Sequence, residues 1–126
     1  MNENFERVLL TLCPTIYRDT DKTLMCYGFS FSDGWFNLIL NLSLKLENMS
    51  KMQKGAKIRI AQCKEKFGTL VVYSDNTTVE MSKIIREFEQ RSEWICEFCG
   101  SQDKSVKTEG LGWIRTLCKD CRKSKT

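Results

Sequence analysis

Two C-x2-C pairs constrain the fold of this chain more than any other feature of its sequence. The first pair is Cys96 and Cys99, the second is Cys118 and Cys121, and 18 residues lie between the pairs. Two residues between thiolates let one tight turn direct both sulfurs at the same ion, and this separation falls within the range of four-thiolate zinc sites. The sequence therefore predicts one Zn²⁺ ion bound by four thiolates, although iron suits the same ligand set.

A site with four protein ligands has no open coordination position. We therefore expect the zinc to be structural, to contribute on the order of 10 kcal/mol to folding, and not to activate water. The segment between the pairs contains Gly110, Gly112 and the β-prone stretch 113–117, which favours a hairpin and a zinc-ribbon-like module. The alternative is a treble clef, in which the second pair begins a helix, but only five residues follow Cys121 and leave little room for one.

The chain contains no histidine. Serine–histidine and cysteine–histidine couples, a histidine general base and histidine metal ligands are therefore all excluded. Glu87 and Glu89 lie two residues apart on a predicted helix, so their carboxylates point in different directions and offer no acid–base pair. We expect a protein that is not an enzyme.

The cysteine count and the first residues indicate a cytoplasmic protein. Seven cysteines cannot all pair, and Glu3 and Glu6 stand where a secretory signal needs a positive start and a longer apolar run. Reduced thiols are therefore expected. The longest apolar clusters are far shorter than the roughly 20 residues that a membrane span requires, so we expect no membrane partner.

Hydrophobic periodicity predicts the elements of the first part of the chain. Helical spacing runs through residues 5–12, 33–54 and 77–91, alternation with a period of two runs through 57–61, and residues 69–73 are rich in β-prone side chains. We predict an α+β fold, in which a small antiparallel sheet packs on two main helices, 33–54 and 77–91, with a C-terminal four-cysteine zinc-ribbon-like module. Residues 1–92 form the core and residues 93–126 form the module, packed together as one compact unit.

The net charge of +4 is concentrated at the C-terminus, where residues 96–126 hold seven basic and four acidic side chains. Phosphate binding and a solvated tail that maintains solubility would both explain this excess. The candidate nucleic-acid contacts are Arg115, Lys119, Arg122, Lys123 and Lys125.

The three tryptophans are candidates for base stacking or for the core. Trp35, Trp94 and Trp113 each lie beside a predicted apolar face or a cysteine pair, so we expect them to pack in the core. No stripe of alternating aromatic and basic residues is evident in the sequence.

Four stretches of the chain, taken in order, resemble a group of small proteins found in bacteriophages and prophages. They are GWFNLI at 34–39, KEKFGTL at 64–70, CEFCG at 96–100 and GWIRTLCKDC at 112–121. The resemblance covers about residues 33–121. It implies a phage-type protein that acts in the cytoplasm of a bacterial host cell, and among such proteins the chain most resembles a zinc-containing anti-CRISPR protein, an inhibitor of a Cas9-type nuclease.

The resemblance implies a non-catalytic inhibitor that binds a bacterial Cas nuclease, or another host defence protein, and blocks its DNA loading or activity. Because the chain is net basic, we expect contact with a protein surface and not mimicry of a whole DNA duplex. The alternative is a nucleic-acid-binding or transcription accessory protein that uses the basic C-terminal tail. An affinity that falls steeply between about 50 and 200 mM salt would favour this alternative.

Overall fold

The computed structural model describes residues 1–124, so Lys125 lies outside the described residues. In chain order the elements are α1 (Glu3–Leu12), η1 (Thr20–Lys22), η2 (Leu24–Tyr27), β1 (Phe29–Ser30), η3 (Asp33–Trp35), α2 (Phe36–Ser50), β2 (Arg59–Lys66), β3 (Thr69–Asp75), α3 (Val79–Arg91), η4 (Ser92–Trp94), β4 (Lys107–Glu109), β5 (Arg115–Leu117) and α4 (Lys119–Ser124). Short 3-10 turns lie between α1 and α2 and after α3, and the C-terminal module follows the last of them.

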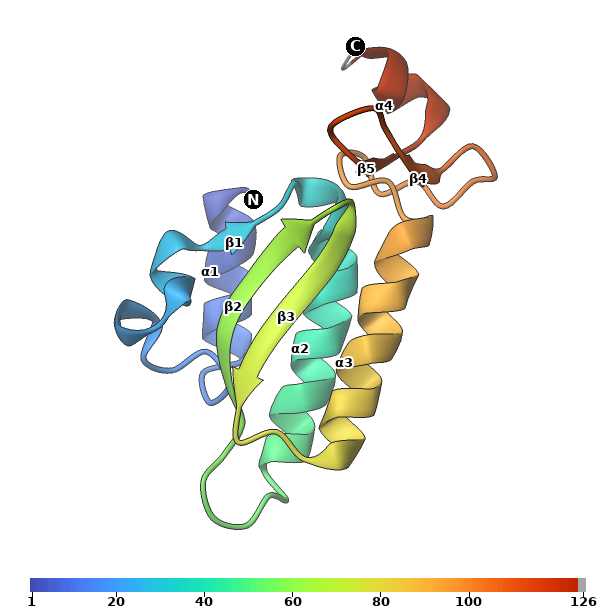
Figure 1. The fold of residues 1–126 in the computed structure, drawn as a ribbon. Helices are drawn as coiled ribbons and strands as arrows, with labels where there is room; N and C mark the ends of the chain where they lie inside the picture. Colours follow the sequence, from blue (N-terminus) through green and yellow to red (C-terminus); the bar gives the residue numbers. More distant parts are fainter. Residues whose placement is uncertain (125–126) are drawn as a thin grey trace.

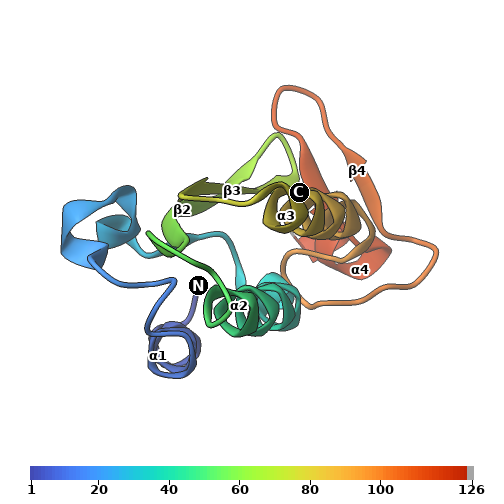
Figure 2. The same ribbon diagram turned by 90° about the horizontal axis from the view of Figure 1, so that it is seen from below.

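The main sheet has the strand order β1-β2-β3, and the helices cover one of its faces (Figure 1). Strands β2 and β3 pair antiparallel, as predicted, whereas β1 pairs parallel with β2. The parallel pair follows from the connection, because α2 lies between β1 and β2 in sequence and carries the chain back to the start of the sheet. The view from below shows α2 and α3 together on the same side of the β2–β3 hairpin, with α1 next to α2 (Figure 2).

The α+β class predicted from the sequence is confirmed. The apolar face of α2 packs against the sheet, and Trp35 lies fully buried just before the helix begins. Side chains from α1, α2, the sheet and α3 share one core, whose members with the least exposure include Leu9, Ile16, Ile39, Leu42, Leu46, Ile58, Ile60, Leu70 and Met81.

The helix predicted over 33–54 is shorter in the structure. Residues 33–35 form the 3-10 turn η3, and α2 ends at Ser50. The Lys57 ammonium donates to the carbonyl oxygens of Ser50, at 2.7 Å, and Gln53, at 2.8 Å. A cation at these carbonyls satisfies groups that a continuing helix would have paired internally. Among residues 1–124, no helix combines the length and the apolar character needed to cross a bilayer.

The outer edge of β3 is closed by side chains of the helix next to it. The backbone N–H of Val72 donates to Glu89 Oε2 at 2.9 Å, and that of Leu70 donates to Ser92 Oγ at 2.9 Å. These acceptors occupy the positions at which another strand would pair. The sheet therefore cannot extend at β3 without displacing both side chains.

Glu89→Gln should stabilise the protein near neutral pH. Burial raises the pKa of Glu89, against the opposing effect of the hydrogen bond from Val72, so the folded state favours the neutral carboxyl. The contribution of Glu89 to the free energy of unfolding is therefore fully present below the pKa that this carboxyl has in the unfolded chain. It is lost as pH rises through the higher pKa of the folded state. Glutamine keeps an oxygen for the Val72 N–H and removes the charge. In urea titrations with metal present, the advantage of the variant should shrink from pH 8 toward about pH 5.

The matched control is Glu87→Gln, which removes an exposed ion pair with Arg91 on the same helix. Its stability should show no such pH-dependent gain. A Glu89→Gln protein that is less stable than the wild type at every pH would contradict the assignment.

Candidate metal centre

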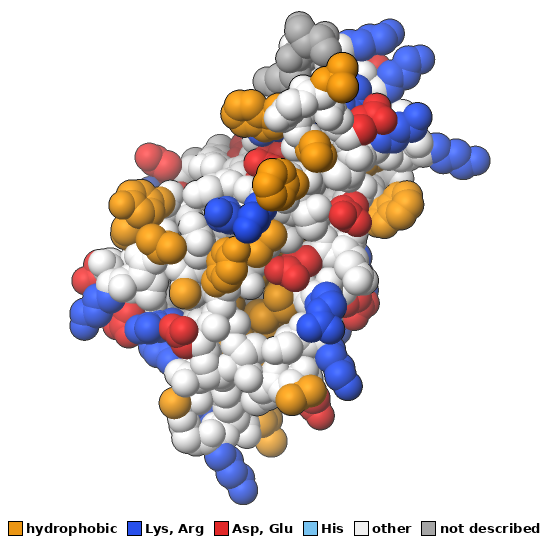
Figure 3. Space-filling model, in the orientation of Figure 1, with side chains coloured by type: hydrophobic (Ala, Val, Ile, Leu, Met, Phe, Trp, Pro, Cys, Tyr) orange, Lys and Arg blue, Asp and Glu red, His pale blue; other side chains and the backbone are white. Residues whose placement is uncertain are grey.

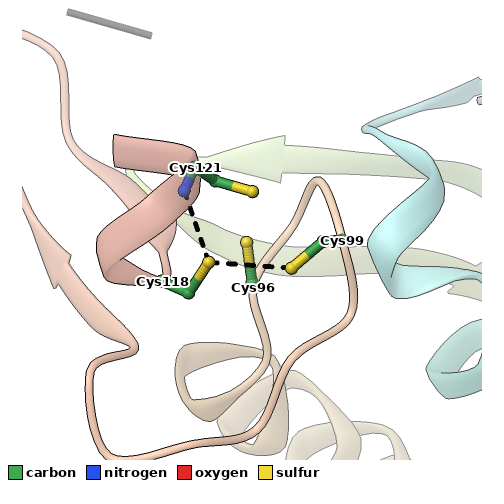
Figure 4. A group of neighbouring side chains, drawn as sticks. All are labelled: Cys96, Cys99, Cys118 and Cys121. Carbon is green, nitrogen blue, oxygen red and sulfur yellow. Dashed lines mark hydrogen bonds between the residues drawn. The ribbon is translucent and has the colours of Figure 1, made fainter. Parts of the chain in front are cut away.

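The four predicted ligands come together at one point. The sulfurs of Cys96, Cys99, Cys118 and Cys121 all lie within 4.8 Å of one another, and the Cys99 and Cys118 sulfurs are 3.6 Å apart (Figure 4). Four sulfurs bound at about 2.3 Å to one tetrahedral ion lie about 3.8 Å from each other. The cluster therefore has the size of a tetrathiolate metal centre.

The first pair sits on a tight turn that precedes the β4–β5 hairpin. The Gly100 N–H donates to the Cys96 carbonyl at 2.9 Å, and the Cys96 N–H donates to the Ser101 carbonyl at 2.8 Å. Gly100 has a φ of 80°, a left-handed conformation that glycine adopts without a steric penalty. This glycine permits the turn that points both sulfurs to the same side.

The second pair spans the start of a helix. Cys118 follows β5 directly, Cys121 lies in the first turn of α4, and the Cys121 N–H donates to the Cys118 sulfur at 3.4 Å. The hairpin between the pairs is present as predicted. The second pair also begins the short helix α4, which is the feature expected of a treble clef, the alternative to the zinc ribbon. The few residues after Cys121 suffice because ligands three apart need only one helical turn to face the same ion.

The local backbone favours thiolate at the most buried ligand. Burial by itself would raise the pKa of Cys96, but N–H groups of Cys99, Cys118 and Phe98 directed at its sulfur lower the pKa to about 7. Burial and the neighbouring sulfurs raise the pKa of Cys121. A divalent cation removes this conflict, because it stabilises all the thiolates together.

Glu97, between the two ligands of the first pair, joins the metal module (residues 93–124) to the core. Its side chain is only 1% exposed, and its Oε2 accepts from the Ser32 N–H at 3.0 Å. Its carbonyl accepts from the Gly34 N–H at 2.7 Å, and its own N–H donates to the Thr116 carbonyl at 2.9 Å. The Arg115 guanidinium lies 3.6 Å from Oε1. Metal turn, hairpin and core therefore meet at one residue.

Further contacts hold the module against the tip of the β2–β3 hairpin, at one end of the sheet (Figure 1). The Thr116 hydroxyl donates to the Gly68 carbonyl at 2.6 Å, and the Thr69 hydroxyl of β3 donates to Glu93 Oε1 at 3.1 Å. The Trp35 indole N–H donates to the Ile95 carbonyl at 2.9 Å. The module thus contacts the core along several of its own segments.

Two of the predicted nucleic-acid contacts serve inside the module. Arg115 lies over the rings of Phe98, at 4.9 Å, and Trp113, at 5.6 Å, besides its attraction to Glu97. Arg122 donates to the Lys107 carbonyl at 2.7 Å and to the Glu109 carbonyl at 3.3 Å. Both guanidinium groups therefore have structural partners.

The other predicted contacts are the lysines of the C-terminus. Lys119 and Lys123 are exposed on α4, and Lys125 lies outside the described residues. Within the described residues, Lys119 and Lys123 on α4 are therefore the predicted contacts that face solvent.

Sequence reasoning placed two tryptophans incorrectly and missed two junction residues. Trp35 is buried as predicted, but Trp94 is 71% and Trp113 is 69% exposed. Glu97 and Gly34 were not singled out, since a charged residue between two ligands is usually solvated and a lone glycine has many explanations. The one local sign of close packing at this junction is that Gly34 directly precedes Trp35, which is buried.

Gly34→Ala should lower the free energy of unfolding by about 3 kcal/mol, at the upper end of overpacking effects. A Cβ atom at this position would lie 2.2 Å from the Cys96 carbonyl oxygen and 2.4 Å from that of Glu97, so the metal turn would have to move. Chemical denaturation measures the change. Asn37→Ala, at an exposed position in the first turn of α2, should stay within about 0.5 kcal/mol of the wild type. Equal effects of the two substitutions would refute the close packing.

Cys99→Ser should abolish stoichiometric metal binding and unfold the module. Removal of one thiolate opens a site whose binding energy is part of the folding energy. Metal analysis and circular dichroism of the purified protein would report the two effects. Cys26→Ser changes an exposed thiol outside the cluster and should retain both metal and stability. A Cys99→Ser protein that keeps its metal would remove this residue from the ligand set.

Comparison with known proteins gives no family assignment. No protein-family model, no curated protein sequence and no solved structure matches the chain. The function is therefore argued from the residues of this chain and from their arrangement.

Proposed function

We propose that this protein is a non-catalytic, phage-type inhibitor that binds a bacterial defence nuclease of the Cas9 type and blocks its DNA loading or activity. A single structural Zn²⁺ ion, held by Cys96, Cys99, Cys118 and Cys121, stabilises the fold. The observation that carries the proposal is the cysteine cluster itself, because four thiolates around one ion leave no position for water or substrate. The specific target comes from the sequence resemblance, and the bacterial cytoplasm is the corresponding compartment.

The two buried thiols outside the cluster, Cys13 and Cys63, support a non-catalytic role. Burial, together with the charge of Glu47, raises the pKa of Cys13 to about 11, and burial raises the pKa of Cys63. A thiol of this kind stays protonated at neutral pH and is a poor nucleophile. The chain also has no histidine to act as its base.

The surface charge favours a protein partner over a nucleic acid. Arg115 and Arg122, two strong candidates for phosphate contacts, are engaged by Glu97 and by carbonyl groups of the β4–β5 hairpin. Four thiolates around a divalent ion carry a charge of −2, which reduces the formal charge of +4 to about +2. Such a surface resembles neither a DNA mimic, which would be strongly acidic, nor a strongly basic phosphate track.

Zinc and iron, the two metals that suit the site, are distinguished on the purified protein. Tetrathiolate zinc is colourless because its d shell is filled, whereas the iron form absorbs visible light. We expect a colourless protein with one zinc per chain.

The function is tested by affinity capture with purified Cas9-type nucleases of several lineages. The tagged, zinc-loaded protein should retain one of them stoichiometrically after nuclease treatment and washes at high salt, because an apolar protein interface depends little on salt. The same mixture should lose DNA cleavage. Capture of none of the nucleases would overturn the proposal.

The alternative, a nucleic-acid accessory protein, predicts the opposite salt response. Binding to an oligonucleotide would weaken steeply between about 50 and 200 mM salt and would collapse in a Lys119→Ala, Lys123→Ala double variant on α4. A nuclease-resistant, salt-resistant protein complex that this double variant still forms would support the inhibitor instead.

A further inference from the structure

We propose that the tips of two β-hairpins form the docking surface for the partner protein, which presents to it an apolar recess bordered by carboxylates. We call this the tip surface and define it as Phe67 of the β2–β3 turn with Leu111, Trp113 and Ile114 of the β4–β5 loop. The inference deepens the proposed function, because the partner is the inhibited protein.

Phe67 occupies a turn for which its side chain is poorly suited. Lys66 pairs with Thr69, so Phe67 and Gly68 are the only residues of the turn, and both have positive φ, of 51° and 84°. A two-residue turn of this type favours Asn-Gly, because asparagine tolerates the left-handed conformation and phenylalanine does not. The Phe67 backbone is therefore strained relative to the usual residue.

Burial does not compensate for this strain, because the Phe67 side chain is 71% exposed. A residue that is unfavourable for the turn and exposes an aromatic ring to water adds nothing to the stability of the isolated chain. Strained positions of this kind concentrate at functional sites. Contact of the ring with another molecule accounts for both features.

The second hairpin exposes apolar side chains in the same manner. Leu111 is fully exposed, at 104%, between Gly110 and Gly112, both of which have positive φ, of 156° and 78°. Trp113 is 69% and Ile114 is 38% exposed. Isolated exposed apolar residues are common, but a group of large ones marks an interaction surface.

The two tips lie side by side. A Cβ atom placed on Gly68 would be 3.2 Å from Ile114 Cγ2 and 3.4 Å from the Arg115 carbonyl carbon, and the Thr116 hydroxyl donates to the Gly68 carbonyl. In the space-filling view, separate apolar side chains lie over the β2–β3 hairpin and over the metal module, with basic and acidic side chains between them (Figure 3). The turn that carries Phe67 and the end of the β4–β5 loop that carries Ile114 are therefore neighbours on one end of the molecule.

Contacts within the metal module hold the Trp113 part of the surface in place. Arg115 is attracted to buried Glu97 and lies over the Trp113 ring, so the metal turn, the arginine and the indole form a continuous set of contacts. Tryptophan, phenylalanine and arginine are also typical of the residues that dominate binding energy at protein interfaces, and a surface fixed in advance loses little entropy on binding.

The charges around the tips select a protein in preference to a nucleic acid. Lys64 and Lys66 alternate along β2 with buried Cys63 and with Glu65, so they point to the open face of the sheet. Among residues 1–124, no carboxylate forms an ion pair with either lysine. These lysines suit carboxylates of a partner.

Two carboxylates beside the Phe67 turn would repel a phosphate backbone. Glu65 accepts from the Gly68 N–H at 2.7 Å, and Glu93 accepts from the Thr69 hydroxyl at 3.1 Å. A nucleic acid would need a run of cations here, whereas a partner protein can place its own apolar and acidic groups separately.

Phe67→Asn tests the tip surface without a loss of folding. Asparagine suits the turn, so the variant should unfold at an equal or higher temperature than the wild type and keep its metal. Its affinity for the Cas9-type nuclease captured by the wild type should fall by about 30-fold, as expected for a central interface residue. Leu111→Ser, which removes a side chain with no packing role, should weaken the same binding by about tenfold.

The control is Met52→Asn, which removes an apolar side chain that is 85% exposed just after α2, and it should leave the affinity unchanged. Binding of each protein to the nuclease, and to a fluorescent oligothymidylate of about 20 nucleotides, would be measured in parallel, with sedimentation velocity of the protein alone.

Retention of nuclease binding by both tip variants would overturn the docking surface and leave the proposed function intact. Failure of the wild type to bind any nuclease would overturn both. If the wild type binds the oligothymidylate and Phe67→Asn abolishes this binding, the surface belongs to single-stranded nucleic acid. If the wild type self-associates and the same variant abolishes the self-association, the surface belongs to a second copy of the chain. Either result would also overturn the inference.

Discussion

The buried carboxylate of Glu97 is the contact on which the metal centre and the core jointly depend. A carboxylate that is 1% exposed needs compensation for its lost hydration, and two different parts of the chain supply it: the Ser32 N–H donates to Oε2, and the Arg115 guanidinium attracts Oε1, which accepts no hydrogen bond within residues 1–124. The separation from Arg115, 3.6 Å, is that of a charge attraction without a hydrogen bond. The flanking cysteines fix the backbone of Glu97, and the core fixes its side chain. Metal binding and docking of the module are therefore coupled, and neither is expected to persist without the other.

This coupling extends to the exposed surface through Arg115. The guanidinium contacts the buried carboxylate on one side and the Trp113 and Phe98 rings on the other, so the position of an exposed indole depends on a residue between two metal ligands. The β2–β3 tip is joined to the same hairpin by the Thr116 hydroxyl. A structural metal can thus determine the shape of a surface that it does not reach, which is the role expected for an ion with a closed coordination shell.

The sequence predicted the features that depend on local spacing. Each such feature depends on residues that lie close together in the sequence. The structure contains all of them: the cysteine pairs, the helical periodicity of α2 and α3 and the alternation of β2. The parallel pairing of β1 was not predictable in this way, because it depends on where α2 returns the chain. Nor was the burial of Glu97, since its partners Ser32 and Gly34 are far away in the sequence. Trp94 and Trp113 were assigned to the core because each lies beside a predicted apolar face or a cysteine pair, but the structure leaves both largely exposed, because the small module has no interior large enough for them.

A metal bound by the four cysteines would also explain how so small a chain tolerates exposed apolar tips. A domain of this length buries only about two thirds of its unfolded surface, so each large apolar residue left outside the core reduces an already small margin of stability. Four thiolates bound to one ion stabilise the module without requiring an apolar core there, and the buried cluster of the module indeed consists mainly of Cys96, Val106, Leu117 and Cys118. Phe67, Leu111 and Trp113 are consequently not needed inside. A bound metal and the Glu97 contacts would together hold the hairpins in place while these side chains remain in water.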